Sequence, residues 1–206
     1  MAEEINQRHD AVQKFINAWD GRGSEKSDAQ SFWLSLLRAL GAENPDDIIR
    51  FEYPIDVEGQ TCFIDGLIIT TKVLIEQKSR GIDLDKPAKQ SDGKFLTPFE
   101  QAKRYADELP YSRRPRWIVT SNFDEIRIYD MDRREDLTPI VIEVERLSME
   151  FRQLNFLIDP EDEDVYPEIR ISKQAGEIVG SLYKAFEKSL SRPDRKSTRL
   201  NSSHDQ

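Results

Sequence analysis

The chain has 206 residues, 33% of them charged and 37% hydrophobic, and its formal net charge at pH 7 is −9. This length suits one globular domain with a modest extension, and the strongly periodic apolar segments argue against a disordered chain. The acidic balance argues against tight, autonomous binding to DNA, because phosphate contacts normally come from a surplus of Lys and Arg.

Apolar residues at helical spacing predict two helices at the N-terminus. The first covers about residues 3–20 and is followed by a polar loop. The second is expected to be capped by Ser27 or Asp28 and to end at Gly41. In this interpretation Glu25 lies in the loop before the second helix, and the aromatic residues of that helix belong to the core.

Three strands are predicted next, over residues 48–55, 61–69 and 72–78. The second and third are short, rich in β-branched residues and joined by a short polar turn, so we expect a hairpin. If Thr70 and Thr71 are its loop residues, the rest of the register follows by counting. A slip of one residue would turn every side chain to the opposite face, and Thr-Thr is not a favoured two-residue turn.

In this register Asp65 lies directly opposite Glu76, and Lys78 projects from the same face. Two carboxylates in an apolar sheet repel each other and lose hydration unless a positive charge lies between them. Mg²⁺ is held in this way, by one or two carboxylates, waters and phosphate oxygens. Lys78 could then orient or deprotonate a water, or stabilise charge on a phosphate, which suggests metal-assisted hydrolysis of a phosphodiester.

The simpler alternative for the same residues is purely structural. Asp65 would end a strand in solvent, and Glu76 and Lys78 would form an ion pair on an edge strand. The motif is short, so its structural context has to decide between the two interpretations.

After Lys78 the chain is polar, and residues 79–94 are interpreted as a loop beside the strand ends. A capping signature then starts at Thr97, with proline in the first turn and Glu100 three residues on, and it predicts a helix to about Leu109. Gln101 lies in this helix, where it has either a positioning role or a packing role.

The second half of the chain alternates strands with helical segments. Strands are predicted at residues 116–120, 125–129 and 140–144, helical structure near 149–154, an acidic linker at 159–164, and a last helix marked by apolar residues from 171 to 186. The fold class is therefore α/β, with a mixed sheet of four or five strands and helices on both sides.

Several other classes of protein are excluded. No apolar run approaches the roughly 20 residues needed to cross a bilayer, and the acidic N-terminus lacks a signal-peptide core. The lone cysteine, Cys62, excludes an internal disulfide, and we expect a cytoplasmic protein with no membrane contact. The two histidines are too few and too badly placed for a histidine-metal nuclease, and no zinc-ligand set or glycine-rich cofactor loop is present.

Asp65, together with the run Leu74-Ile75-Glu76-Gln77-Lys78-Ser79-Arg80-Gly81, resembles the PD-(D/E)XK nuclease motif. More narrowly, the chain is similar to the N-terminal nuclease domain of single-chain type II restriction-modification enzymes of the IIL/IIG type, in which the nuclease is fused to an adenine-specific DNA methyltransferase. The likeness covers about residues 5–190. One departure is Ile64, which stands where such motifs often have a proline.

The resemblance implies a restriction-endonuclease-like sandwich and a set of site residues. Asp65, Glu76 and the backbone carbonyl of Gln77 would bind Mg²⁺, and Lys78 would be catalytic together with the two carboxylates. Glu25 and Gln101 match auxiliary positions. The alternatives are a solvated loop charge or a helix N-terminal acid for Glu25, and a packing or capping role for Gln101.

The substrate expected from these roles is double-stranded DNA, and a transient dimer would cut both strands. Arg80, Lys86 and Lys89, in the polar loop, are candidates for phosphate contacts, although a solvated loop would also account for them.

The resemblance also divides the chain. Residues 1–168 would form the nuclease domain, and residues 169–191 would begin a helical spacer towards a methyltransferase that uses S-adenosylmethionine. Residues 192–206 lack periodicity and resemble a translated sequencing-adapter read-through, so we exclude them from the interpretation. Two rival hypotheses keep the fold without cleavage: a DNA-binding relative without catalysis, and a structural spacer for a methyltransferase.

Overall fold

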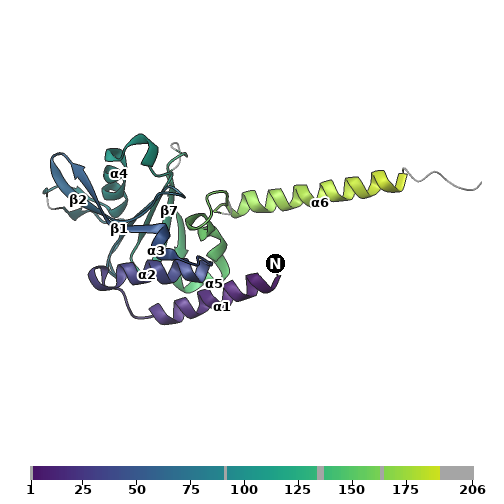
Figure 1. The fold of residues 1–206 in the computed structure, drawn as a ribbon, viewed down its shortest axis with the longest axis horizontal. Coiled ribbons are helices and arrows are strands. Elements are labelled where there is room, and N and C mark those ends of the chain that lie inside the picture. The colour runs from purple at the N-terminus through teal and green to yellow at the C-terminus, as the bar shows by residue number, and fades with distance from the viewer. Residues whose placement is uncertain (1, 91, 134–136, 163–164, 191–206) are drawn as a thin grey trace, which may run out of the picture. The chain divides into compact units, whose positions relative to one another are not determined.

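The computed structural model describes residues 2–90, 92–133, 137–162 and 165–190. By its internal contacts the chain forms two compact units, residues 1–165 and the residues from Tyr166 on. Within the described ranges, no helix is both long and apolar enough to cross a membrane. The first unit is built around a six-stranded sheet (Figure 1).

The strands are β1 (Ile49–Val57), β2 (Gln60–Ile68), β3 (Val73–Gln77), β4 (Ala88–Lys89), β5 (Phe95–Leu96), β6 (Trp117–Ser121), β7 (Glu125–Asp130) and β8 (Ile140–Glu143). The α-helices are α1 (Ala2–Trp19), α2 (Glu25–Leu40), α3 (Pro45–Ile48), α4 (Pro98–Glu108), α5 (Leu147–Glu150) and α6 (Pro167–Leu190). Short 3-10 helices cover Tyr111–Arg113, Val144–Arg146 and Phe151–Leu157.

The large sheet is mixed and has the strand order β1-β2-β3-β6-β7-β8. The central pair, β3 and β6, is parallel, and every other neighbouring pair is antiparallel. The predicted α/β class is therefore confirmed, but the sheet has six strands and not four or five. All six predicted strands join this one sheet, including the strand predicted at residues 140–144, which is β8 and forms one edge beside β7.

The predicted register of the central hairpin is confirmed. Ile68 pairs with Val73 and Gly66 with Ile75. The turn is longer than two residues: it covers Ile69 to Lys72 and is closed by a hydrogen bond of 3.3 Å from the Lys72 N–H to the Ile69 carbonyl. Lys72 has a positive φ of 56°, which reverses the chain without shifting the register.

Helix α4 covers one face of the sheet (Figure 1). It begins with the predicted capping box, in which Thr97 and Glu100 each accept a hydrogen bond from the other's backbone N–H. Ala102, at 0% exposed, packs in one core cluster with Leu74 and Ile118 from the sheet. The apolar spacing of this helix therefore buries one stripe against the strands, as an amphipathic helix does.

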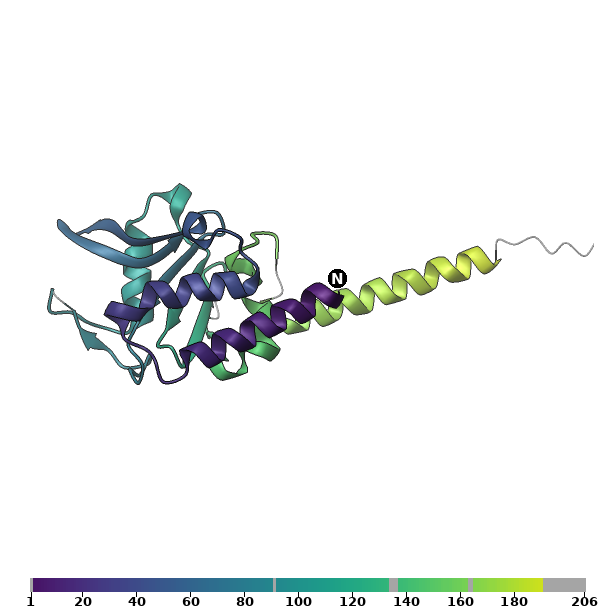
Figure 2. The same cartoon turned by 60° about the horizontal axis from the view of Figure 1, so that its bottom comes forward.

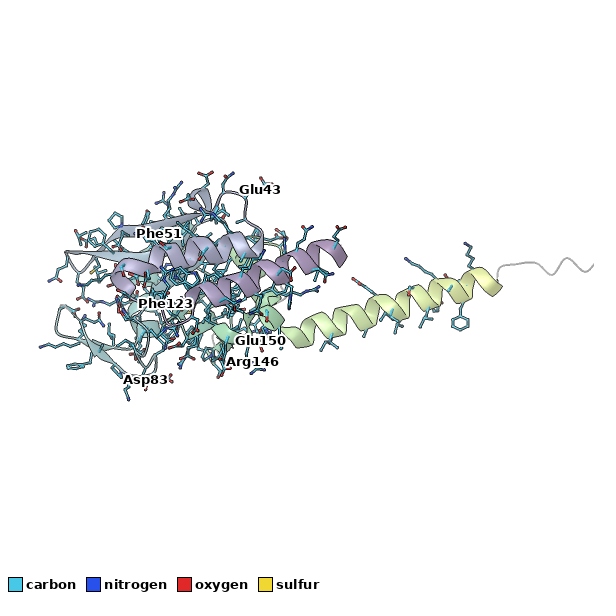
Figure 3. All side chains as sticks on the ribbon, turned by 90° about the horizontal axis from the view of Figure 1, so that it is seen from below. Glu43, Phe51, Asp83, Phe123, Arg146 and Glu150 are labelled. Atoms are coloured by element: carbon cyan, nitrogen blue, oxygen red, sulfur yellow. The ribbon has the colours of Figure 1, made fainter. Side chains whose placement is uncertain are left out.

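Helices α1 and α2 cover the opposite face (Figures 1 and 2). Their contact is aromatic: Trp19 and Phe32 meet Phe123, with 5.0 Å between the ring centroids of Phe32 and Phe123. Phe123 follows β6 and is fully buried within this layer (Figure 3). The aromatic residues of the second helix are thus part of the core, as predicted.

Two local predictions are wrong. Helix α2 begins at Glu25, after Ser24, and not at Ser27 or Asp28. Asp28 instead accepts a hydrogen bond of 3.0 Å from the Ser24 backbone N–H, so it closes the first turn from inside the helix. The polar loop predicted after Lys78 also contains β4, which pairs with β5 directly after the loop and forms a short hairpin that no alternation of apolar residues predicts.

The second unit contains the predicted last helix, α6. Its apolar residues, among them Ile178, Leu182 and Phe186, are exposed. Residues 163–164 of the predicted acidic linker and residues 192–206 of the excluded tail lie outside the described residues.

Candidate active site

Asp65 and Glu76 come from adjacent strands at the end of the central hairpin. The last ladder pair is Gly66 with Ile75, so Asp65 and Glu76 occupy the next opposed positions. Asp65 Oδ2 accepts a hydrogen bond of 2.7 Å from the Gln77 backbone N–H. A side chain at Gly66 would place its Cβ only 3.1 Å from Ile49, so glycine allows the strands to pack closely beside Asp65.

Lys78 follows the last residue of β3 and brings its ammonium group to Glu76. Lys78 Nζ lies 2.6 Å from Glu76 Oε1 and 3.9 Å from Glu25 Oε1. Its backbone N–H donates to the Ser121 carbonyl over 2.7 Å, which continues the β3–β6 pairing by one residue. The structure therefore brings Glu25, Asp65, Glu76 and Lys78 into one cluster.

Glu25 reaches this cluster because the start of α2 is tied to the segment after Lys78. The Glu25 backbone N–H donates to Ser79 Oγ over 3.1 Å. The Arg80 N–H donates to the Gly23 carbonyl over 2.9 Å. These bonds join residues more than fifty positions apart, so the placement of Glu25 depends on the tertiary fold.

Gln77 is held by several hydrogen bonds. Its side-chain oxygen accepts from Trp33 Nε1 over 2.9 Å, and its amide nitrogen donates to the carbonyls of Ser121 and Lys78. The side chain is fully buried. Sequence reasoning missed Trp33 in this role, because helical spacing predicts its burial but not the partner of its indole N–H.

Arg80 is occupied by contacts within the protein. Its guanidinium donates to the Trp19 and Phe123 carbonyls and to the Asp124 carboxylate. These bonds tie the loop to the aromatic cluster of Trp19, Phe32 and Phe123. They give Arg80 a structural role, and its predicted phosphate contact stays a prediction.

The carboxyl groups of the cluster have pKa values well above their ordinary range. Burial, the neighbouring Asp65 and the charge of Glu25 raise the pKa of Glu76 to about 8, although Lys78 opposes this. Burial also raises the pKa of Asp65 to about 6, against the effects of the Gln77 N–H and Lys78. For Lys78, burial lowers the pKa, but the surrounding carboxylates, Glu76 above all, outweigh it and leave the pKa raised.

The donor set fits a hard divalent cation. Glu76 is 1% exposed, and among the described residues its Oε2 atom has no hydrogen-bond partner, so one buried carboxylate oxygen is available as a ligand. The described part of the chain holds no group of three or more His, Cys, Asp or Glu residues placed to bind a metal. A cation held by Asp65 and Glu76 would therefore need oxygens from the backbone or from water and substrate, which is the usual situation for Mg²⁺.

The other predicted residues make contacts outside this cluster. Gln101 donates to the Tyr105 hydroxyl over 3.3 Å, and its buried Oε1 has no partner among the described residues. Lys86 is exposed and pairs with Asp83, and Lys89 is exposed on β4.

Glu52 was missed by sequence reasoning. It has a positive φ of 49° within β1 and lies close enough to contribute to the raised pKa of Asp65. An irregularity of this kind inside a strand leaves no signal in the pattern of apolar residues.

A cavity of about 780 Å³ lies elsewhere, at the opposite end of β3. Lys72, Lys103, Tyr111 and Trp117 are among its lining residues, and none of the clustered carboxylates is. We place the candidate site at the carboxylates and not at this cavity, because buried, mutually close ionisable groups are what acid-base and metal chemistry requires.

Comparison with known proteins identifies a family but no individual relative. The family model described as "MmeI, N-terminal domain" matches residues 7–189. No curated protein and no solved structure matches the chain. Since the match covers most of the chain, the protein belongs to the family of the N-terminal domain of MmeI, a type IIL restriction-modification enzyme.

Proposed function

We propose that this chain is the DNA-cleaving module of a restriction-modification enzyme, with a restriction-endonuclease-like PD-(D/E)XK fold. Membership of the MmeI N-terminal family supports the assignment to a restriction-modification enzyme. The observation that carries the proposal is the cluster itself: two opposed carboxylates, a lysine amine 2.6 Å from one of them, and a buried oxygen of Glu76 without a described partner.

In the proposed site, Asp65, Glu76 and the Gln77 carbonyl would hold Mg²⁺. When bound, the ion would supply Lewis-acid stabilisation of the phosphate and a more acidic water. The hydrogen bonds of Gln77 to Trp33 and Ser121 keep this residue in place beside Asp65. Metal ligation depends on such supporting contacts as well as on the ligands.

Lys78 is assigned the role of orienting the attacking water and stabilising negative charge on the phosphate. A lysine with a raised pKa is a poor general base at neutral pH, so charge stabilisation is the better supported of its roles. Glu25, 3.9 Å from the Lys78 ammonium, would orient that amine. From its place on α4, Gln101 would help to position Lys78 or the DNA.

The remaining assignments follow from a DNA substrate. One such site cuts one strand, so a transient dimer would give a double-strand break. Lys86 and Lys89 are the proposed phosphate contacts nearby. Adenine methylation with S-adenosylmethionine would belong to another part of a longer, cytoplasmic enzyme.

The deciding experiment is cleavage of unmethylated plasmid DNA in the presence of Mg²⁺ by the complete gene product. Glu76→Ala and Lys78→Ala should each lower the single-turnover cleavage rate at least about a hundredfold, with methylation retained. Glu43→Ala, at an exposed carboxylate outside the site, is the matched control and should cut like the parent.

Two outcomes would refute the proposal. Parent-like cleavage by a folded Lys78→Ala protein would exclude the assigned catalytic role. Absence of cleavage by every protein, under conditions where methylation proceeds, would favour a binding or spacer domain, and calorimetric titration with Mg²⁺ would then separate these two.

A further inference from the structure

A small hairpin follows the candidate site in the chain. Its strands β4 and β5 pair Lys89 directly with Phe95, and its turn is closed by a hydrogen bond of 2.8 Å from the Gln90 N–H to the Lys94 carbonyl. Strands of two residues do not hold a fixed position by themselves. The position of this hairpin must therefore come from contacts with the rest of the domain.

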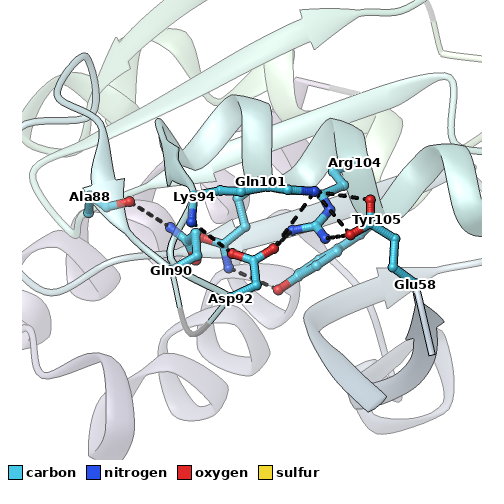
Figure 4. A network of polar contacts seen from close by, with 8 residues as sticks. All are labelled: Glu58, Ala88, Gln90, Asp92, Lys94, Gln101, Arg104 and Tyr105. Atoms are coloured by element: carbon cyan, nitrogen blue, oxygen red, sulfur yellow. Dashed lines mark hydrogen bonds and ion pairs between the residues drawn. The ribbon is translucent and has the colours of Figure 1, made fainter. Parts of the chain in front are cut away.

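Charged contacts supply that anchorage (Figure 4). Asp92 accepts from Arg104 of α4 over 2.5 Å, and Lys94 donates to both carboxylate oxygens of Glu58 over 3.0 Å. Arg104 also donates to Glu58 over 3.0 Å. The network joins the hairpin to α4 and to the β1–β2 turn, which lies at the same end of the domain (Figure 2).

The two faces of the hairpin differ. Leu96 lines a small cavity together with Val57 and Tyr105, so this side of β5 faces the protein. Neighbouring side chains on a strand point to opposite faces, and Phe95 therefore faces outward. It is 66% exposed, and its opposed neighbour Lys89 is exposed as well.

The hairpin adjoins the helix that packs over the strand of the candidate site. The hairpin connects Lys78 to α4, and α4 carries Gln101 and Tyr105. Tyr105 packs in one core cluster with Leu74, which lies two residues before Glu76 on β3, so this part of α4 packs over the strand that carries Glu76. A substrate bound at the carboxylates would extend past the hairpin if it were a long polymer.

We propose that Lys89 and Phe95 form a DNA-contacting face beside the cleavage site, an inference that rests on the proposed nuclease function. The Phe95 ring would pack against sugar and base edges in a groove, where apolar side chains are used by DNA-binding proteins. The Lys89 ammonium would meet the adjacent phosphate. DNA is a polyanion whose sugars and bases also offer apolar faces. A cation opposite an exposed aromatic ring, on a hairpin held by ion pairs, suits both features, although the domain as a whole is acidic.

The test measures single-turnover cleavage of unmethylated plasmid over a range of enzyme and salt concentrations, with the complete enzyme. Phe95→Ala should raise the half-saturating enzyme concentration about tenfold and leave its salt dependence unchanged. Lys89→Ala should also weaken binding and should lower the slope of log affinity against log salt by about 1. Tyr111→Ala and Lys103→Ala, at the cavity beside the opposite end of β3, are matched controls expected to behave like the parent.

The inference is overturned if Phe95→Ala and Lys89→Ala keep the parent's half-saturating concentration and salt slope. If the complete enzyme cuts no DNA, the proposed nuclease function fails, and binding of a short fluorescein-labelled duplex then decides the hairpin separately. Weaker binding by both variants, with the slope changed only for Lys89→Ala, supports the DNA-contacting face. Unchanged binding by both overturns it.

Discussion

At the scale of single residues, the site is defined by a conflict between burial and charge. Glu76 is 1% exposed, next to Asp65, and has one carboxylate oxygen without a described partner. Lys78 compensates part of this charge at 2.6 Å. The arrangement is costly for stability and suited to cation binding, since a bound cation would favour the ionised carboxylates that the fold alone disfavours.

This conflict predicts an unusual pH dependence of stability in the metal-free protein. The folded-state pKa of Glu76, about 8, lies above the ordinary glutamate value of 4.5, so the folded state holds its proton more tightly. This contribution is fully present below about pH 4.5 and is lost as the pH rises to about 8. In urea unfolding with a chelator, we expect the parent's free energy of unfolding to fall by a few kcal/mol across this window.

Glu76→Gln removes the titrating group and should make that decline much shallower, with a remaining contribution from Asp65 up to about pH 6. Added Mg²⁺ should restore stability to the parent at the alkaline end and have less effect on the variant. If the free energy of unfolding changed with pH in parallel for parent and variant without metal, this would contradict the raised pKa of the buried Glu76.

The central residues of the site were predictable because strand geometry has a period of two. Once the Thr70–Thr71 turn is located, Asp65, Glu76 and Lys78 have to share a face. The supporting contacts were not predictable in the same way. The bond between Trp33 and Gln77 joins residues 44 positions apart and depends on how α2 lies on the sheet.

At the scale of elements, the start of α2 is the part of the fold that delivers Glu25. Gly23 lies against Arg80, and a Cβ at Gly23 would be 2.6 Å from the Arg80 Cβ. Its φ of 156° and this close approach leave no space for a side chain. The loop before α2 is thus held against the segment after Lys78.

We therefore expect Gly23→Ala to destabilise the domain by about 1 to 3 kcal/mol. The Arg80 Cβ is bonded directly to the backbone, so side-chain rotation cannot relieve the clash. Gly21→Ala is a matched control, with a positive φ of 70° but nothing within 4 Å of the added carbon. It should cost only about 1 kcal/mol from backbone strain.

Urea unfolding of both variants distinguishes the two effects. Equal losses in the two variants would mean that backbone strain alone matters, and that the contact of Gly23 with Arg80 does not hold α2 in place. Gly23→Ala should also slow Mg²⁺-dependent cleavage, since it displaces Glu25, whereas Gly21→Ala should not.

Elements with a strong period were predicted well, and elements without one were missed. Helix α4 combines a capping box with an apolar stripe, and its observed bounds, Pro98–Glu108, agree with the prediction. The β4–β5 hairpin has two-residue strands held by ion pairs to Glu58 and Arg104, partners that lie outside its own segment. No local pattern predicts an element whose position comes from distant charges.

At the scale of the whole molecule, the net charge of −9 is the main physical constraint on a DNA-cleaving role. Repulsion between this charge and the DNA backbone opposes association at long range. The proposed contacts at Lys86, Lys89 and Phe95 are local and few. Under the proposed function, affinity for DNA should therefore reside mainly in other parts of the proposed longer enzyme, with this domain positioned for cleavage after binding.

This argument predicts that the chain alone binds duplex DNA weakly. In fluorescence anisotropy with a labelled duplex at physiological salt, its dissociation constant should lie above about 10⁻⁵ M, towards the weak end of non-specific binding. The complete enzyme, measured in parallel, should bind far more tightly. Binding by the isolated chain in the submicromolar range would instead mean that its local cations overcome the net charge, so that substrate capture and cleavage would both belong to this domain.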